Sequence, residues 1–196
     1  MDITVSNISK VYGNQQILKD FSCTFPEGKT TCIMGESGCG KTTLINILLR
    51  LEGLDGGSVE GLKEKKLSAV FQENRLCENL SAAANIRLIC TRHVSDEEID
   101  AAFQAVKLQE IWKKPVRDLS GGMRRRVAIL RALEAESDCV IMDEPLKGLD
   151  EETRRQTAEY ILKKTKGKTL IIVTHERKEA ELLQAEHMIF MPEAFC

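Results

Sequence analysis

The chain has 196 residues, which fits one domain with a full-sized core and leaves little room for a second. Charged residues make up 30% of it and hydrophobic residues 42%, a balance typical of a soluble globular protein. The net charge of −2 argues against a sequence-independent nucleic-acid binder, which would carry a basic excess, so we expect no nucleic-acid partner.

The apolar runs are too short to cross a bilayer. Leu170–Val173 and Ala82–Ala84 are typical, whereas a transmembrane helix needs about 20 mostly apolar residues. Met1–Thr4 lacks the basic-then-apolar pattern of a signal peptide. We therefore expect a cytoplasmic protein that lies on the inner face of the cell membrane only through a partner. The seven cysteines, without a CxxC pair, argue against a disulfide framework or a zinc site, so most should be buried small hydrophobes.

Before residue 75 the pattern is mostly that of strands. The start alternates like a half-buried strand, and Pro26–Gly28 reads as a turn. A glycine-rich run then separates an apolar strand from a segment of helical composition. The predicted elements are the strands Ile3–Val5, Gln16–Phe25 and Lys29–Met34, the helix Lys41–Leu51, a loop or short hairpin Gly53–Gly61, and the strand Leu67–Phe71.

Residues 78–138 look mainly helical. Ser95 and Glu98 form a capping box for a helix through about Lys107, and Pro115 breaks the pattern. The later elements are a continuously apolar strand Cys139–Asp143, the helices Ser120–Glu134, Glu151–Lys166 and Glu176–Glu186, and the strands Thr169–Thr174 and His187–Met191. This alternation predicts an α/β core with a helical insert between about 75 and 137.

The glycine-rich run matches the phosphate-binding pattern G-x-x-x-x-G-K-[ST], between a strand and a helix. Its residues are Gly35, Glu36, Ser37, Gly38, Cys39, Gly40, Lys41 and Thr42. Glycines let phosphate oxygens approach the backbone, whose N–H groups and helix N-terminus face the anion. Lys41 would reach the β- and γ-phosphates, and Thr42 would offer a hydroxyl to Mg²⁺. Cys39 is either a tolerated small residue or a thiolate favoured by the helix N-terminus.

Two further clusters point to the same chemistry. Ser120-Gly121-Gly122 opens a helix, as an anion-facing helix start or with Ser120 as a plain N-cap. Asp143 ends a strand, where ligand sites of α/β proteins lie, and can hold Mg²⁺. Glu144 beside it can act as a base, with its backbone restricted by Pro145, or the two acids could be an exposed turn.

These motifs, in this order, resemble the ATP-binding cassette (ABC) family over almost the whole chain. The resemblance implies a P-loop NTPase core of about 1–74 and 138–196, with a mostly parallel sheet and an N-terminal antiparallel β subdomain. It also implies an inserted helical subdomain of about 75–137, so that 1–196 is one ABC ATPase domain. Walker A of the family matches Gly35–Thr43, with Thr43 as its last residue, and the Q-loop glutamine matches Gln72. The signature matches Leu119–Met123, Walker B matches Cys139–Asp143, and the D-loop matches Leu149–Asp150. The A-loop aromatic matches Tyr12.

The resemblance implies roles for the matched positions. Glu144 would be the catalytic glutamate and His175 the switch histidine that contacts the γ-phosphate, with Lys41 and Gln72 also catalytic. Mg²⁺ would be held by Thr42, Gln72 and Asp143. Two chains would sandwich two ATP molecules, each between Walker A of one copy and Ser120–Gly122 of the other.

Each of these roles has a plainer alternative. His175 after a strand could be structural, Gln72 could be a solvated strand end, and Tyr12 could pack in its strand. Arg124–Arg126 point in different directions on a helix, so we expect a solvated or intersubunit face there. Two residues depart from the family pattern: Met123 stands where the signature commonly has Gln, and Lys147 where a small residue is often found.

The expected partners are inferred from the segment around Gln72. Val70–Leu76 resembles bacterial importer ATPases for nitrate, sulfonate and related nutrients. We therefore expect separate integral-membrane subunits, a second copy of the cassette, and indirectly a solute-binding protein. Leu76, Leu80 and Ile86 are either groove contacts for the membrane partner or core of the insert. The alternative function is a soluble non-transport ABC ATPase or a nucleotide-binding regulator.

Overall fold

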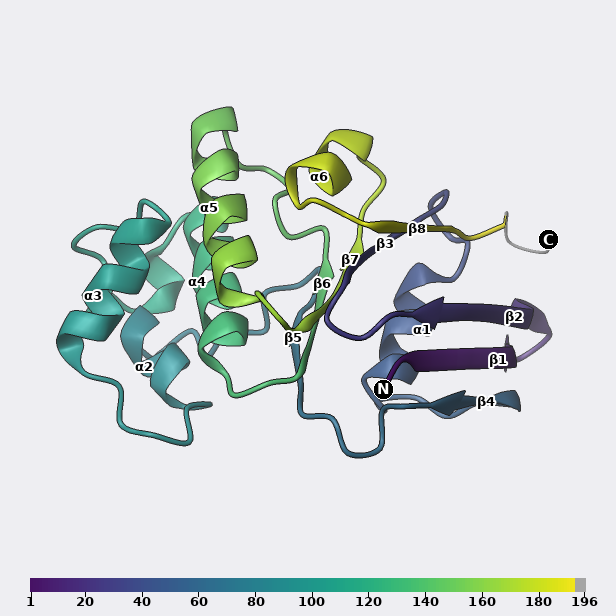
Figure 1. Ribbon diagram of the computed structural model, residues 1–196. Helices are drawn as coiled ribbons and strands as arrows, with labels where there is room; N and C mark the ends of the chain where they lie inside the picture. Colours follow the sequence, from purple (N-terminus) through teal and green to yellow (C-terminus); the bar gives the residue numbers. More distant parts are fainter. Residues whose placement is uncertain (193–196) are drawn as a thin grey trace.

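The computed structural model describes residues 1–192, and its elements form three groups along the molecule (Figure 1). A parallel sheet lies in the centre, with a helical segment at one end and a small antiparallel sheet at the other. None of the helices within residues 1–192 combines the length and the apolar content needed to cross a bilayer.

The central sheet has five strands in the order β5-β6-β7-β3-β8, and every neighbouring pair is parallel. This confirms the predicted α/β class with a mostly parallel sheet. The strands are β3 (Thr30–Met34), β5 (Leu67–Val70), β6 (Cys139–Asp143), β7 (Thr169–Val173) and β8 (His187–Phe190).

Both faces of this sheet are buried, which explains the continuous apolar runs of its central strands. Along β6, Val140 and Met142 point into one core and Cys139 and Ile141 into the other. The first core is shared with α4 (Gly121–Glu134) and α5 (Glu151–Lys164), and the second with α1 (Lys41–Leu48). The sheet is therefore a middle layer whose position is fixed from both sides.

The antiparallel sheet has the order β2-β1-β4. Its strands are β1 (Ile3–Tyr12), β2 (Gln15–Phe25) and β4 (Gly56–Glu60). The prediction of a loop or short hairpin at Gly53–Gly61 is wrong, because β4 pairs with β1 and not with a neighbouring segment. The first strand is also longer than predicted, and it continues through the two-residue turn Gly13–Asn14 into β2.

The helical segment contains α2 (Ala82–Arg87), α3 (Asp96–Ala105), the 3₁₀ turn η1 (Val116–Asp118) and α4, with α6 (Arg177–Leu182) lying on the core. The capping box of α3 is confirmed: the Glu98 amide donates to Ser95 Oγ at 3.2 Å, and the Ser95 amide donates to Glu98 Oε2 at 3.0 Å. Helix α4 contacts α2, β5 and α5, so it joins the helical segment to the sheet.

Three apolar residues of this segment, predicted to be either groove contacts or core, differ in their exposed fractions. Ile86 is fully buried and belongs to the core, whereas Leu80 is 37% exposed and Leu76 is partly buried. The groove interpretation is therefore wrong for Ile86 and stays a prediction for Leu80, while Leu76 packs against the core cluster. Cys32, Cys39 and Cys139 are buried as expected, but Cys77 is exposed, and Cys196 lies outside the described residues.

Asn85 fixes the loop that enters α2, and it is fully buried. Its Oδ1 accepts the Cys77 amide at 2.8 Å, while its Nδ2 donates to Cys77 O at 3.0 Å and to Ser81 O at 3.1 Å. One side chain thus satisfies the main chain of a loop that has no regular structure of its own.

Asn85→Leu should lower the free energy of unfolding by about 2 kcal/mol, because the Cys77 amide loses its acceptor inside the protein. Denaturant unfolding measures this loss. Asn79→Leu is the control, since Asn79 is exposed and its replacement should change the same quantity by less than about 0.5 kcal/mol. Equal losses in the two variants would show that Asn85 does not organise the loop.

Candidate active site

A pocket of about 520 Å³ lies where strands β3, β5, β6 and β7 end. Ligands of open α/β sheets bind at this carboxyl edge. The pocket collects residues that are far apart in the sequence but were predicted to act together. Its lining is Tyr12, Ile17, Gly35, Glu36, Ser37, Gly38, Gly40, Lys41, Thr42, Thr43, Gln72, Asp143, Glu144, Lys147 and His175.

The loop between β3 and α1 is shaped by its glycines. A Cβ added at Gly35 would lie 2.6 Å from Cys39 Sγ, and one at Gly40 would lie 2.9 Å from Leu18 Cδ2. Gly40 also has a φ of 96°, in the left-handed region that favours glycine. No side chain caps the first amides of α1, so these N–H groups are available to an anion in the pocket.

Lys41 lies folded over this loop. Its Nζ donates to Gly35 O at 2.8 Å and to Glu36 O at 2.6 Å, which places the ammonium at the mouth of the glycine cradle. Thr42 is exposed on the first turn of α1 and lines the pocket. A cation and a hydroxyl therefore stand beside uncapped amides, the donor set that a phosphate group with a divalent cation requires.

Cys39 is the one residue of the loop that does not line the pocket. It is 3% exposed and packs among the core residues near Met191, with its Sγ 3.7 Å from Lys41 Nζ. Burial keeps reagents in solution away from this thiol. The structure therefore favours Cys39 as a packing residue over an oxidant-sensitive one.

Asp143 ends β6 and Glu144 follows it, and the two carboxyl groups lie in different environments. Asp143 is 7% exposed, and burial together with the neighbouring Glu144 raises the pKa of its carboxyl group. A buried carboxylate with a raised pKa is one that a cation would stabilise in its charged form, so Asp143 and Thr42 fit a Mg²⁺ site. Glu144 turns away with a left-handed φ of 47°, and its amide donates to Val173 O at 2.8 Å.

The Glu144 carboxylate has two partners. Its Oε1 lies 2.7 Å from His175 Nδ1, and its Oε2 accepts from Lys147 Nζ. Burial opposes the charged form of Glu144, but the hydrogen bonds from Lys147 and His175 outweigh it, so the pKa of Glu144 lies below its ordinary value. Lys147, noted in the sequence only as a departure, is thus a pocket residue bound to the predicted base.

Tyr12 and Gln72 line the pocket from two different elements. Tyr12 is 43% exposed at the end of β1, with Lys10 Nζ 5.5 Å from its ring centroid. Gln72 is exposed two residues after β5. Neither is packed into a strand, so both are accessible to a ligand. Ile17 was missed, because nothing in the sequence separates it from other apolar strand residues.

The signature residues lie outside this pocket. Ser120 is the N-cap of α4 and its Oγ accepts the Met123 amide at 3.3 Å, while Gly121 and Gly122 form the first turn. The structure therefore brings together Walker A, Gln72, Asp143, Glu144 and His175 within one chain, but not Ser120–Gly122.

Comparison with known families supports this arrangement of motifs. The family model described as ABC transporter matches residues 18–147, more than half of the chain. This chain belongs to the ABC transporter family. The match includes the P-loop, Gln72, the signature helix and the Asp143–Glu144 pair.

Two relatives show how the chain compares in length with other ABC proteins. It is 38% identical over 190 residues to the taurine import ATP-binding protein of Roseobacter denitrificans, covering 90% of this chain and 70% of the relative. It is 32% identical over 200 residues to the sulfate/thiosulfate import ATP-binding protein of Neisseria meningitidis serogroup B, covering 92% of this chain. That alignment covers 56% of the relative, so the chain spans little more than half of its length.

Solved ABC cassettes share the fold. The dimeric post-hydrolysis structure of the ATP-binding cassette MJ0796 bound to ADP and Pi has a TM-score of 0.84 and 27% identity, over 99% of this chain and 97% of that one. A second dimeric structure of the same bacterial ABC transporter cassette gives 0.85 and 29%, over 96% and 94%. The predicted ABC ATPase fold is therefore confirmed.

The three arginines that follow the ABC signature differ in their surroundings. The prediction of a solvated or intersubunit face is wrong for Arg125, which is 6% exposed. Arg126 is half-buried and donates to the carbonyls of Val106 and Lys107, both at 2.8 Å. Arg124 Nη2 donates to Arg117 O at 2.7 Å. All three are used inside the chain, because each guanidinium donates to main-chain carbonyls.

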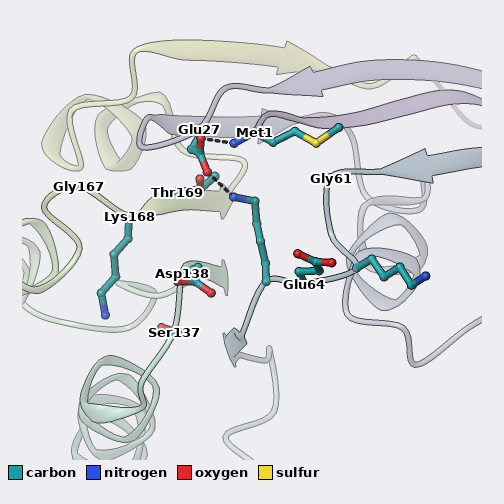
Figure 2. A pocket seen from close by; sticks show the side chains of 11 residues that line it. Met1, Glu27, Gly61, Glu64, Ser137, Asp138, Gly167, Lys168 and Thr169 are labelled. Atoms are coloured by element: carbon teal, nitrogen blue, oxygen red, sulfur yellow. Dashed lines mark hydrogen bonds and ion pairs between the residues drawn. The ribbon is translucent and has the colours of Figure 1, made fainter.

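A second hollow, of about 820 Å³, lies at the opposite edge of the sheet, where the parallel strands begin (Figure 2). In it Glu27 binds Lys65 at 2.6 Å and also the Met1 amine. Lys65 and then this amine lower the pKa of Glu27 to about 2. Because sheet ligands bind at carboxyl ends and not at amino ends, we assign the functional site to the smaller pocket.

Lys147→Met should raise the pKa of the Glu144 carboxyl group toward its ordinary value, because it removes the cation that lowers it most. Carbon-13 NMR of labelled glutamate side chains, followed through acidic pH, measures this change. Lys113→Met serves as the control, since Lys113 is exposed and lies outside the pocket lining. An unchanged Glu144 titration in Lys147→Met would show that the pair does not form in solution.

Proposed function

We propose that this chain is the ATP-binding and ATP-hydrolysing subunit of an ABC transporter. The observation that carries the proposal is the convergence of an uncapped glycine loop, Lys41, Asp143 and Glu144 on one pocket at the carboxyl edge of the sheet. A binding-only regulator would have no use for a carboxylate placed beyond Asp143, so Glu144 favours hydrolysis.

The chain's own groups account for nucleotide binding. The α1 amides and Lys41 bind the phosphates, and Tyr12 offers an exposed ring to stack on the adenine. Thr42, Asp143 and Gln72 would hold Mg²⁺, which supplies neutralisation of phosphate charge when bound. The remaining P-loop residues Glu36, Ser37, Gly38 and Thr43 line the same pocket and complete the cradle.

Hydrolysis follows from the position of Glu144. Water attacks the γ-phosphorus, the bond to the bridging oxygen of ADP breaks, and the Glu144 carboxylate accepts the proton of the water. His175 already bonds to Glu144 and orients it. Gln72, which lines the same pocket, would contact the attacking water. Lys41 and the amides of α1 stabilise the charge that develops on the phosphate oxygens.

The second copy of the chain completes the site. Ser120, Gly121 and Gly122 lie outside their own chain's pocket, so in a head-to-tail dimer they would close on the ATP of the partner. Their helix start is suited to the γ-phosphate, since its first amides meet only the Ser120 side chain. The dimeric cassette bound to ADP and Pi supports this arrangement by analogy of fold.

The transport role is inferred from the relatives. Those compared above are named as import ATP-binding proteins for taurine and for sulfate/thiosulfate. We infer that the chain works with separate integral-membrane subunits of a bacterial importer, which would place it on the inner face of the membrane. A solute-binding protein would take part indirectly. Cargo specificity would lie in these partners.

Glu144→Gln should trap the ATP-bound dimer. Glutamine keeps the shape of the side chain but cannot accept the proton, so ATP binds and closure occurs while hydrolysis slows by at least about 100-fold. Size exclusion with light scattering, with and without ATP at high protein concentration, measures the dimer.

The control adds Ser120→Arg to Glu144→Gln in the same chain, which blocks closure by placing a bulky cation at the helix start. This double variant should stay monomeric in ATP. A single variant that is monomeric in ATP and hydrolyses at the wild-type rate would contradict both the base assignment and the sandwich arrangement.

Lys41→Ala should weaken ATP binding by at least about tenfold, because it removes the point charge on the β- and γ-phosphates. Isothermal titration calorimetry measures the affinity, with Lys113→Ala as a matched loss of a surface lysine. Equal affinities in the two variants would exclude Lys41 from the phosphate site.

A further inference from the structure

Arg125 lies at the junction between the signature helix and the pocket. It belongs to α4, four residues after Gly121, and is 6% exposed. Its guanidinium faces the carboxyl ends of β5 and β6, which carry Gln72 and Glu144. No step of the proposed reaction uses Arg125.

This guanidinium binds the main chain of both segments. It has five N–H donors in a rigid plane, and a carbonyl oxygen accepts from each of its three nitrogens. After β5 the acceptors are Phe71 O, Gln72 O at 3.5 Å and the side-chain Asn74 Oδ1 at 3.3 Å. At the end of β6 they are Asp143 O, in the last residue of the strand, then Glu144 O at 2.8 Å and Pro145 O at 3.3 Å.

Such a contact set is specific to arginine. Burial lowers the pKa of Arg125, while the nearby carboxylates of Asp143, Glu179 and Glu144 counteract this effect. A buried cation is retained only where its donors are satisfied, and here two separate segments satisfy them. Lysine has a single ammonium at the end of a flexible stem and cannot bond to both segments in the same way.

The other arginines of α4 do not make this connection. Arg126 binds the carbonyls of Gly122, Val106 and Lys107, all within the helical segment. Arg131 binds the carbonyls of Asn74 and Arg75. Within residues 1–192, Arg125 is therefore the arginine of α4 that bonds to the β5 end and the β6 end together.

We propose that Arg125 is a positioning residue that couples the signature helix to Gln72 and Glu144 of its own chain. The proposal rests on the proposed function, in which the start of α4 closes on the partner's ATP. Closure moves α4, and the Arg125 hydrogen bonds transmit this movement to the two main-chain segments that carry the water-facing groups. Each nucleotide site thereby responds to the occupation of the other.

Arg125→Met tests the proposal in the purified full chain, since methionine fills similar space without donors. The expected result is a fall in kcat of at least about tenfold, the size of effect that a displaced catalytic group produces. The Kd of ATP should stay within about threefold, because Arg125 makes no hydrogen bond to residues 35–43. Arg131→Met is the matched control, because Arg131 also lies on α4 and donates to the Asn74 and Arg75 carbonyls without reaching the β6 end, so it should leave kcat within about threefold.

A double variant distinguishes positioning of Glu144 from general destabilisation. If Arg125 acts through Glu144, Arg125→Met should cause a smaller fold-loss of hydrolysis in the Glu144→Gln background than in the wild type. A merely structural role would give multiplied losses in the double variant. Multiplied losses, or a wild-type kcat in Arg125→Met, would overturn the proposal.

If Arg125→Met does not fold, the same measurements are made on Arg125→Lys. Lysine keeps the charge but cannot bond to both segments. Its kcat should also fall while the Kd of ATP is kept, and a wild-type kcat would overturn the proposal. The proposed function is judged separately. Hydrolysis by Glu144→Gln at the wild-type rate would contradict the function itself, whereas a loss in Glu144→Gln with none at Arg125 contradicts only the positioning role.

Discussion

The burial of the parallel sheet on both faces is the constraint on which the rest of the structure depends. Strand β6 has no exposed residue, so one face needs α4 and α5 and the other needs α1 and the antiparallel sheet. Parallel strands also end at the same edge. The loops after β3, β5, β6 and β7 therefore meet there, and each can contribute one polar group to a shared pocket.

The elements that meet at this edge are held together by a few buried polar side chains. Glu179 in α6 accepts the Leu146 amide at 2.7 Å and the Thr174 hydroxyl, so it joins the turn after Glu144 to the residue before His175. Arg125 joins the same turn to the segment after β5. The pocket is thus framed by one buried anion and one buried cation, each bonded to two loops, which restricts how far the loops move independently.

Local patterns in the sequence predicted most of the fold and much of the pocket. The apolar run before Asp143, the glycine loop and the capping box at Ser95 each depend on neighbouring residues, and all three are found as predicted. The strand Gly56–Glu60 was missed, because two glycines and a serine give no apolar pattern and its partner β1 lies about 50 residues away. Its pairing comes from tertiary contacts that the segment itself does not encode.

The set of residues that line the pocket was easier to predict from the sequence than the hydrogen bonds between their side chains. Three consecutive arginines look alike in sequence, yet a difference of 100° in helical direction buries only Arg125 fully. In the sequence, Lys147 was noted only as a departure from the family pattern. In the structure, the tight turn after Glu144 brings the Lys147 ammonium back to the Glu144 carboxylate. The spacing of motifs identifies which residues converge, whereas their hydrogen bonds depend on turn geometry that spacing does not determine.

The left-handed backbone of Glu144 places stability and activity in conflict at one position. A φ of 47° costs a residue with a side chain roughly 1 kcal/mol relative to glycine. Glycine would remove this backbone cost and would lose the hydrogen bonds to Lys147 and His175, which contribute little to stability because both partner side chains are more than half exposed. A search for more stable variants would therefore tend to select glycine there. The glutamate is kept at an energetic disadvantage, so sequences evolved or designed for thermostability without selection for turnover should lose the carboxylate at this position early.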